Sequence, residues 1–331
     1  MGTEQRRVTI HDVAAAAGVS RQTVSRALND KPEIDERTKA RVLAAARELG
    51  YRPSRFARGL VRQDTTTVGL VVPDLRNPFF TEVAASALEA ARARDWHVVV
   101  HDTADSPEEE VTTLRVIGGQ VDAVVGYFSQ PEEEIERHLP GLPVVFLGRR
   151  HHGPRFRSIR IDGADGMAEA VAHLKARGHT HLGMLDHKHR PEPSERRDWF
   201  LHALARHGYP PERAPVLGAV QSVDGGAQAF SQLRAAHPEV TAVLTFNDVI
   251  AVGALRQARR DGLAVPERFA VVGFDGLELG EIVDPPLTTV DINTHRLGEL
   301  AIHAVGNALA GVAPRPEEQL VRGTLRVRGS A

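Results

Sequence analysis

The sequence predicts an α/β protein made of a small helical head, a linker and two doubly wound lobes. Three observations carry this prediction. Residues 9–49 hold three short helical patterns separated by turns. From Val68 onward, apolar β-branched runs alternate with helical stretches, which is typical of parallel sheets covered by helices on both faces. The length of 331 residues corresponds to about two domains at roughly 150 residues each.

Composition limits the class of protein. The chain has no cysteine, so it forms no disulfide framework, no cysteine zinc site and no thiol nucleophile. Its start lacks the apolar core of a secretory signal, and no run approaches the roughly 18 apolar residues that span a membrane. We therefore expect a cytoplasmic protein, complete as written, with no membrane partner.

Charge is distributed unevenly along the chain. Residues 1–62 hold 13 Lys and Arg against 7 Asp and Glu, a net charge of +6. The remaining residues hold 28 and 36, a net charge of −8. A basic head on an acidic body indicates that the head binds a polyanion, while charge alone is equally compatible with a solvated surface.

A helix-turn-helix is predicted inside the head. The first helix begins at Thr9 and ends at Gly18, a residue suited to a C-terminal cap. Ser20 caps a second helix, RQTVSRAL, whose apolar residues form one narrow face. The third helix begins after Asp35 and ends at Gly50. A generic three-helix bundle without a DNA-binding role is the alternative.

The second helix has the residues of a recognition helix. Arg21, Gln22 and Arg26 lie on the face opposite the apolar one, within its first two turns. Arginine bonds guanine bidentately and glutamine bonds adenine, so these residue types suit the reading of base edges in the major groove. Residues 51–66 follow as a basic linker that also carries apolar side chains at Phe56, Leu60 and Val61.

Eight strands are expected in the body, separated mostly by helices. The strands lie at residues 68–72, 97–102, 123–128, 144–148, 181–185, 242–246, 269–274 and 287–291, and the helices at 79–94, 163–178, 194–208, 226–236, 247–260 and 295–309. Acidic runs at 108–110 and 132–134 mark two further helix starts, where the helix dipole favours acids. We place crossings between the lobes near 160–163 and 287–293, and ligands in such folds bind at the carboxyl ends of strands.

The chain resembles one known family over nearly its whole length. VTIHDVAAAAGVSRQTVSRALN, followed by KARVLAAARELGYRPSRFARGL, is similar to the lactose-repressor (LacI/GalR) family of bacterial transcription regulators. LVVPDLRNPFF, FNDVIAVGAL and GFDGLELGEIVDPPLTTV resemble the same family. The resemblance implies a ligand-controlled DNA-binding regulator, expected to be a repressor, whose two lobes resemble periplasmic sugar-binding proteins.

The resemblance also implies partners and domain boundaries. We expect a homodimer on a pseudo-palindromic DNA operator, because the chain ends RGTLRVRGSA without the leucine heptads of tetrameric members. The expected domains are a DNA-binding head at 1–50, a hinge at 51–66 and an effector-binding and dimerisation domain at 67–331. Within the last, lobe 1 covers about 67–161 and 290–320, and lobe 2 about 162–289 and 321–331.

Site residues for DNA follow from the matching motif positions. Arg21, Gln22 and Arg26 are implied to read bases. Residues implied to contact phosphates or sugars are Thr9, Ser20, Thr23, Ser25 and Asn29. The segment that begins with Ser54 and Arg55 is implied to become a hinge helix on DNA, where Leu60 wedges into a central minor-groove step. The alternative for Leu60 is a packing contact against the body.

Six residues are expected to contact the effector: Phe79, Phe80, Arg149, Arg196, Asn247 and Asp275. Arg196 matches the arginine that binds effector in the family, although Trp199 stands where glycine is usual and alters the expected pocket shape. We expect Arg149 to face the same crevice and Asp248 to be the N-cap of the helix after the strand AVLTF. The alternative for these residues is a packing or surface role.

The effector and its role remain open at this point. We expect a carbohydrate, and the alternatives are a purine, a phosphorylated metabolite or a constitutive DNA-binding protein with a vestigial pocket. An α/β enzyme with a fused head is disfavoured, because no phosphate loop and no nucleophile motif occur. No cofactor is expected. His179, His181, His187 and His189 lack a completing carboxylate or cysteine, so we do not expect a metal site.

Overall fold

The computed structural model describes residues 10–28, 34–49, 65–149, 156–188, 194–312 and 320–331. The chain divides into two compact units, Met1–Thr66 and Thr67–Ala331, each with its own core. None of the helices in these ranges is long and apolar enough to cross a membrane.

The described residues of the first unit form a head of three helices. Its helices are α1 (Ile10–Ala17), α2 (Arg21–Leu28) and α3 (Glu36–Glu48). Val13, Val24 and Val42, one from each helix, are fully buried against one another and surrounding alanines. Gly18 has a φ of +62°, a conformation that glycine adopts without a steric penalty, and it ends α1 as predicted.

In the second unit, the described residues form eleven strands in one continuous sheet order. The strands are β1 (Thr67–Val72), β2 (His97–Asp102), β3 (Ala123–Gly126), β4 (Val144–Leu147), β5 (Arg157–Asp162), β6 (Leu182–His187), β7 (Val216–Ala219), β8 (Ala242–Thr245), β9 (Ala270–Asp275), β10 (Thr288–Ile292) and β11 (Leu320–Arg326). Their order in space is β2-β1-β3-β4-β5-β11-β10-β9-β8-β6-β7. All neighbouring pairs are parallel except β10 and β11.

Helices cover both faces of this sheet. They are α5 (Pro78–Arg92), α6 (Pro107–Ile117), α7 (Glu132–His138), α8 (Ala164–Ala176), α9 (Glu195–Arg206), α10 (Val223–Ala236), α11 (Asp248–Arg260), α12 (Leu279–Ile282) and α13 (Thr294–Leu309), with a 3₁₀ turn at Pro211–Arg213. Because both faces are covered, every residue of β3, β4, β8 and β9 is buried.

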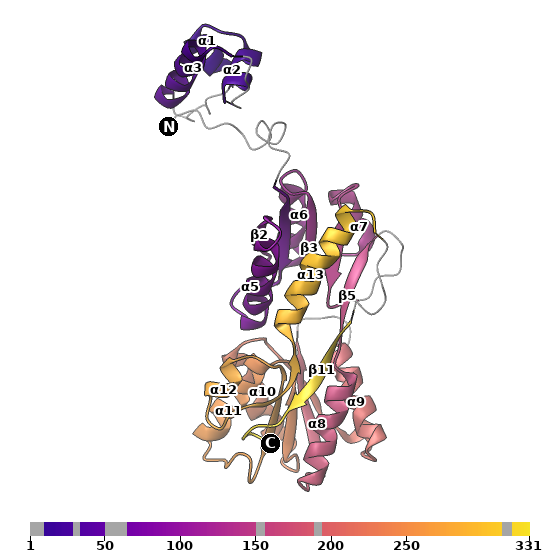
Figure 1. The fold of residues 1–331 in the computed structure, drawn as a ribbon. Coiled ribbons are helices and arrows are strands. Elements are labelled where there is room, and N and C mark those ends of the chain that lie inside the picture. The colour runs from indigo at the N-terminus through magenta and orange to yellow at the C-terminus, as the bar shows by residue number, and fades with distance from the viewer. Residues whose placement is uncertain (1–9, 29–33, 50–64, 150–155, 189–193, 313–319) are drawn as a thin grey trace. The chain divides into compact units, whose positions relative to one another are not determined.

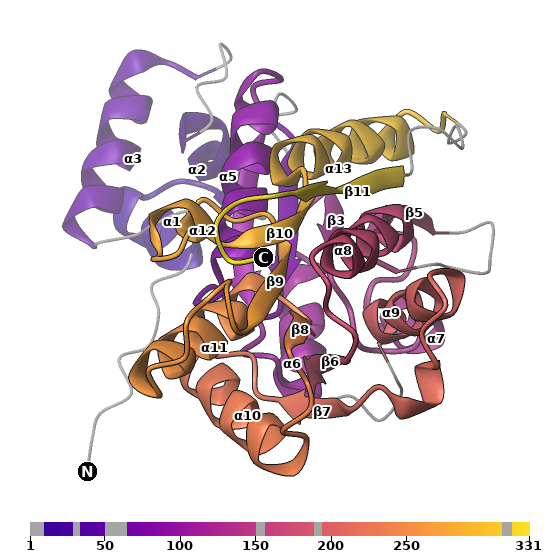
Figure 2. The same ribbon diagram turned by 90° about the horizontal axis from the view of Figure 1, so that it is seen from below.

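The unit has two lobes, which confirms the predicted fold class. Lobe 1 contains β1–β5 with α5, α6, α7 and α13, and lobe 2 contains β6–β11 with α8–α12 (Figure 1). Figure 2 shows α10 and α11 on one face of the lobe 2 sheet and α8 and α9 on the other. In lobe 1, α13 lies against α5, where a Cβ on Gly298 would come within 2.7 Å of the Ala87 nitrogen.

The two lobes share one seam of backbone pairing. Leu320, Val321 and Arg322 at the start of β11 pair with residues 160–162 of β5 in lobe 1. The later residues of β11 pair with β10 in lobe 2, in antiparallel register. One strand therefore joins the two sheets, and the chain also crosses between the lobes after β5 and after β10.

Sequence patterns missed three strands and misassigned one cap. Strands β5, β7 and β11 were not expected, because RSIRID and LVRGTLR mix charged with apolar residues and VLGA is short. The predicted cap at Asp248 is wrong, since the Asn247 side chain accepts from the Ile250 backbone N–H at 2.9 Å. Asp248 is fully buried one residue later. The acidic runs do open α6 and α7, as predicted.

Candidate functional site

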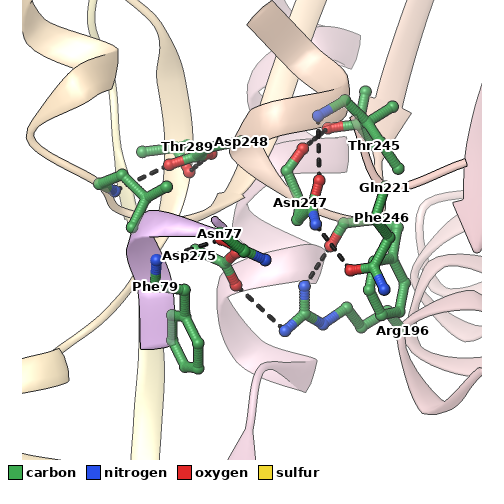
Figure 3. A network of polar contacts seen from close by, with 12 residues as sticks. Asn77, Phe79, Arg196, Gln221, Thr245, Phe246, Asn247, Asp248, Asp275 and Thr289 are labelled. Atoms are coloured by element: carbon green, nitrogen blue, oxygen red, sulfur yellow. Dashed lines mark hydrogen bonds and ion pairs between the residues drawn. The ribbon is translucent and has the colours of Figure 1, made fainter. Parts of the chain in front are cut away.

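Strand ends in lobe 2 bring an arginine and an aspartate together. Asp275 is the last residue of β9, and Arg196 lies in the first turn of α9, which follows β6. The Nη2 atom of Arg196 is 3.1 Å from Oδ1 of Asp275, and Nη1 donates to the carbonyl of Phe246 (Figure 3). The side chains of Arg196 and Asp275 are 15% and 2% exposed. This arrangement is a buried ion pair at the carboxyl edge of the sheet.

The guanidinium of Arg196 contacts two aromatic rings. Its Cζ atom lies 4.4 Å from the centroid of Phe246 and 4.0 Å from that of Phe274. Both distances are within the range of cation–π attraction, which is stronger where water is excluded. The rings and the carboxylate therefore fix the plane and the position of this guanidinium.

Asp275 is strained and electrostatically perturbed. Its φ of +125° is unusual for a residue with a side chain, and such strain in structures clusters at functional sites. Burial acts to raise the pKa of Asp275, while the charge of Arg196 opposes this rise and favours the carboxylate. Burial also raises the pKa of Asp248 to about 6, and this carboxyl accepts from Leu277 N at 2.8 Å and from Thr289 Oγ1 at 2.6 Å.

Asn247 is held by contacts within lobe 2. Its Oδ1 caps α11, and its Nδ2 donates to Oε1 of Gln221 at 2.9 Å. Asn247 is 1% exposed, whereas Gln221 is partly exposed in the loop between β7 and α10 (Figure 3). Gln221 was not predicted as a site residue, because β7 gave no strand signal in the sequence.

Lobe 1 contributes an aromatic cluster at the ends of β1 and β3. The ring centroids of Phe79 and Phe80 are 5.4 Å apart, and those of Phe80 and Tyr127 are 5.1 Å apart, with edge-to-face geometry. Asn77 orders this segment, since its Oδ1 accepts from the Phe79 N–H at 3.1 Å and caps α5. Phe79 is buried and Phe80 is partly exposed.

Tyr127 brings lobe 1 close to the ion pair. Its hydroxyl is buried and has no hydrogen-bond partner among the residues that the structure describes. Burial raises the pKa of Tyr127, with the charge of Asp275 adding to the effect and that of Arg196 opposing it. Sequence patterns gave no signal for Tyr127, because it lies inside the predicted strand at 123–128 as one aromatic residue among several apolar ones. In the structure it directly follows β3, which ends at Gly126.

In the head, α2 presents polar side chains to solvent. Arg21, Gln22 and Arg26 are exposed on the face away from buried Val24. Ser20 caps the helix, because its Oγ accepts from the Thr23 N–H at 3.1 Å and lies 2.9 Å from Thr23 Oγ1. Five residues expected at the DNA lie outside the described residues, namely Thr9, Asn29, Ser54, Arg55 and Leu60.

Known protein families match both the helical head and the two-lobed second unit. Residues 9–54 match the model for bacterial regulatory proteins of the lacI family, and residues 171–331 match a periplasmic binding protein-like domain. The HTH-type transcriptional repressor CytR of Escherichia coli (strain K12) is 31% identical over 333 residues, covering 99% of this chain and 97% of CytR. The chain belongs to the LacI family. It is therefore a DNA-binding transcriptional regulator, and the homologues are regulators rather than enzymes.

Solved structures of LacI-family members match the fold. A LacI family transcriptional regulator from Arthrobacter sp. FB24 in complex with lactose is 30% identical, with a TM-score of 0.74, over 81% of this chain and 99% of that one. The Lac repressor dimer bound to operator and the anti-inducer ONPF is 27% identical, with a TM-score of 0.75, over 98% of this chain and 99% of that one.

In this LacI-family chain, Arg149 contacts the segment of lobe 1 that follows β3. Its Nη1 donates to the carbonyls of Phe128 at 3.2 Å and Gln130 at 2.9 Å, and its guanidinium lies 4.4 Å from the Phe146 centroid. These contacts order the loop after β3 within lobe 1. None of the contacts that the structure gives for Arg149 links it to the Arg196–Asp275 pair, so its place in the same crevice stays a prediction.

Proposed function

We propose that this LacI-family regulator is a homodimeric repressor controlled by a neutral carbohydrate that binds between the lobes at the Arg196–Asp275 pair. The relatives support the class of effector, since one is crystallised with lactose and another, 28% identical, is a CelR–cellobiose complex. CytR supports the repressor role by its name.

The observation that carries the proposal is the pairing of Arg196. Its guanidinium already faces the Asp275 carboxyl at 3.1 Å and donates to a backbone carbonyl. An anionic phosphate placed there would be repelled by the carboxylate of Asp275. It would also have to compete with Asp275 and the Phe246 carbonyl for the guanidinium of Arg196, so a phosphorylated metabolite is disfavoured. A sugar hydroxyl both donates and accepts, and it can bond Asp275 and Arg196 together without disturbing their charges.

Groups on the two sides of this pair suit a ring with polar edges. Gln221 supplies an amide and Tyr127 a hydroxyl without a described partner. Phe80, partly exposed beside Tyr127, supplies an apolar face for the C–H side of a sugar ring. The same aromatic face suits a purine, which is therefore the competing outcome of the test.

On the DNA side, we propose that α2 enters the major groove of a pseudo-palindromic operator. Arg21 and Gln22 would read guanine and adenine, with Arg26 beside them. Ser20, Thr23 and Ser25, together with Thr9, Asn29, Ser54 and Arg55, would contact phosphates and sugars. The hinge at 51–66 would carry Leu60 to the centre of the operator, and the effector-binding domain at 67–331 would supply the dimer contact.

The test begins with the full-length protein and an operator selected from random duplex DNA. Melting temperatures are then measured with neutral mono- and disaccharides, sugar phosphates, and purine bases and nucleosides, because a ligand that binds only the folded state stabilises it. We expect a neutral sugar to raise the melting temperature and to release the operator in a fluorescence-anisotropy titration.

Two carboxyl variants locate the site. Asp275→Asn should lose the stabilisation by the sugar, and Glu134→Gln should retain it, because Glu134 lies in α7 of lobe 1 and pairs there with Arg137 and His138. Stabilisation by a sugar phosphate or a purine instead would overturn the carbohydrate assignment. Stabilisation that survives in Asp275→Asn would place the site elsewhere.

A further inference from the structure

Trp199 lies one helical turn after Arg196 and contacts the same aromatic ring. Residues three apart on a helix share a face, so both side chains of α9 point toward β9. The rings of Trp199 and Phe274 are stacked, with centroids 6.0 Å apart and planes 19° apart. The Arg196 guanidinium lies 4.0 Å from the centroid of Phe274, which is fully buried.

The segment that leaves lobe 1 packs against this stack. Gly163 is the residue between β5 and α8, at one of the crossings between lobes. A Cβ at Gly163 would lie 2.5 Å from Cζ of Phe274 and 2.8 Å from Cζ3 of Trp199, so no side chain fits there. The Gly163 Cα lies 3.2 Å from the Cβ position of Gly323 in β11, the strand that joins the two sheets.

We propose that Trp199 is a positioning residue: through Phe274 it fixes the guanidinium of Arg196 in place and couples it to the lobe crossing at Gly163. The stack leaves Phe274 no room to move away from Arg196 without moving Trp199 or the crossing backbone. A change in lobe orientation is therefore transmitted to Arg196 through two ring contacts, and a ligand that moves Arg196 acts on the crossing by the same route. This inference rests on the proposed function only where it assumes a ligand that moves Arg196.

The positioning role is measured without any sugar. In the full-length protein labelled with ¹⁵N-arginine, the Nε–Hε signal of Arg196, assigned by its loss in Arg196→Lys, reports ring currents from Phe246 and Phe274. We expect this signal to move toward that of exposed arginines in Trp199→Ala and to stay near its wild-type place in Trp199→Phe, which retains a stacked ring. A role in stability alone would change the melting temperature and leave the signal of the folded protein unmoved.

Gly163→Ala tests the coupling from the lobe crossing and leaves the side chains of Arg196, Trp199 and Phe274 unchanged. Its φ of −99° suits alanine, so the added methyl acts only by its contact with Phe274 and Trp199. We expect the Arg196 signal to shift, and amide exchange of residues 272–275 to become about tenfold faster, a local loosening. Gly306→Ala, in the helix α13 of lobe 1, is the matched control and should change neither.

An unmoved Arg196 signal in Gly163→Ala would overturn the proposal, and so would an unmoved signal in a folded Trp199→Ala variant. If Trp199→Ala does not fold, Gly163→Ala and Trp199→Phe decide it alone. Failure to find a sugar effector would leave these results unchanged, so the two proposals fail separately.

Discussion

The Nη2 atom of Arg196 lies 3.1 Å from Oδ1 of Asp275, and the carboxyl of Asp275 is almost completely withdrawn from solvent. Such a pair is costly to form and more costly to break, because removing one partner leaves the other charge buried and uncompensated. Asp275 also occupies a strained backbone conformation. The folded chain therefore maintains the pair against both the cost of burying charge and the cost of backbone strain.

Breaking the pair should affect stability and effector response but not operator contact. Asp275→Ala is expected to lower the free energy of unfolding by about 3–5 kcal/mol, whereas Asp165→Ala at the exposed Arg322–Asp165 pair should change it by less than about 1 kcal/mol. Under conditions where both variants are folded, Asp275→Ala and Arg196→Ala should bind operator near wild type and fail to release it with effector. Urea denaturation and anisotropy measure the two effects, and parallel loss of operator binding would show a purely structural role.

The buried carboxyl of Asp248 should make stability fall as pH rises. Its ordinary pKa is 3.8, and burial raises it to about 6. Over this interval the folded chain keeps a proton that the unfolded chain has released, so the stabilisation present below about pH 4 is lost as the pH rises through about 6. In Asp248→Asn, the fall in the free energy of unfolding between about pH 4 and pH 7 should be smaller than in wild type. An identical fall in both proteins would contradict the raised value.

Exposed residues of α2 should carry specificity for the operator. Gln22→Ala and Arg26→Ala are each expected to weaken operator binding by about 1–3 kcal/mol while leaving binding to random DNA nearly intact. Arg41→Ala, an exposed arginine on α3, is the control for loss of charge. Equal losses on operator and random DNA would mean that Gln22 and Arg26 contact only the phosphates.

Two substitutions of Ser20 distinguish its role as a helix cap from its predicted contact with DNA. Because Ser20 Oγ accepts from the Thr23 N–H, Ser20→Ala should destabilise the head by about 1 kcal/mol. Ser20→Asp restores a capping acceptor but adds a negative charge, so it should keep the stability and weaken DNA binding through repulsion by phosphate. Thermal unfolding and anisotropy on the full chain measure both. If Ser20→Asp binds operator as wild type does, Ser20 does not lie near a phosphate.

Leu60 remains a prediction from sequence. Leu60→Ala should weaken operator binding and reduce the bend in the DNA without changing the response to effector, because an apolar wedge kinks a flexible base step. A circular-permutation gel assay measures the bend. A bend equal to that of the wild type would contradict the wedge.

Strong local patterns predicted most of the fold. The strands at 68–72 and 97–102 and the three helices of the head were located to within a residue or two, because continuous apolar runs and capping residues act locally. Strand β11 was missed because its residues LVRGTLR alternate between buried and exposed sides and its partners β5 and β10 lie far away in sequence. A long-range pairing of this kind leaves little local signal.

The site was predictable only in part for the same reason. Arg196 and Asp275 follow strands, and strand ends meet at one edge of a parallel sheet, so their approach could be expected. Gln221 and Tyr127 could not be predicted as site residues, because their roles depend on side chains that are distant in sequence. The contacts of Arg149 could not be predicted either: its residue type fits a ligand contact, but it donates to backbone carbonyls of its own lobe.

The interleaving of the lobes has a consequence for synthesis on the ribosome. Helix α13, which covers α5 in lobe 1, is made after almost all of lobe 2, and β11, which lies sixth of eleven strands in space, is made after both. Neither lobe can therefore be completed while the other is still to be translated. A nascent chain released before residue 294, where α13 begins, would expose the apolar face of α5, and such a fragment is a natural substrate for chaperones and proteases.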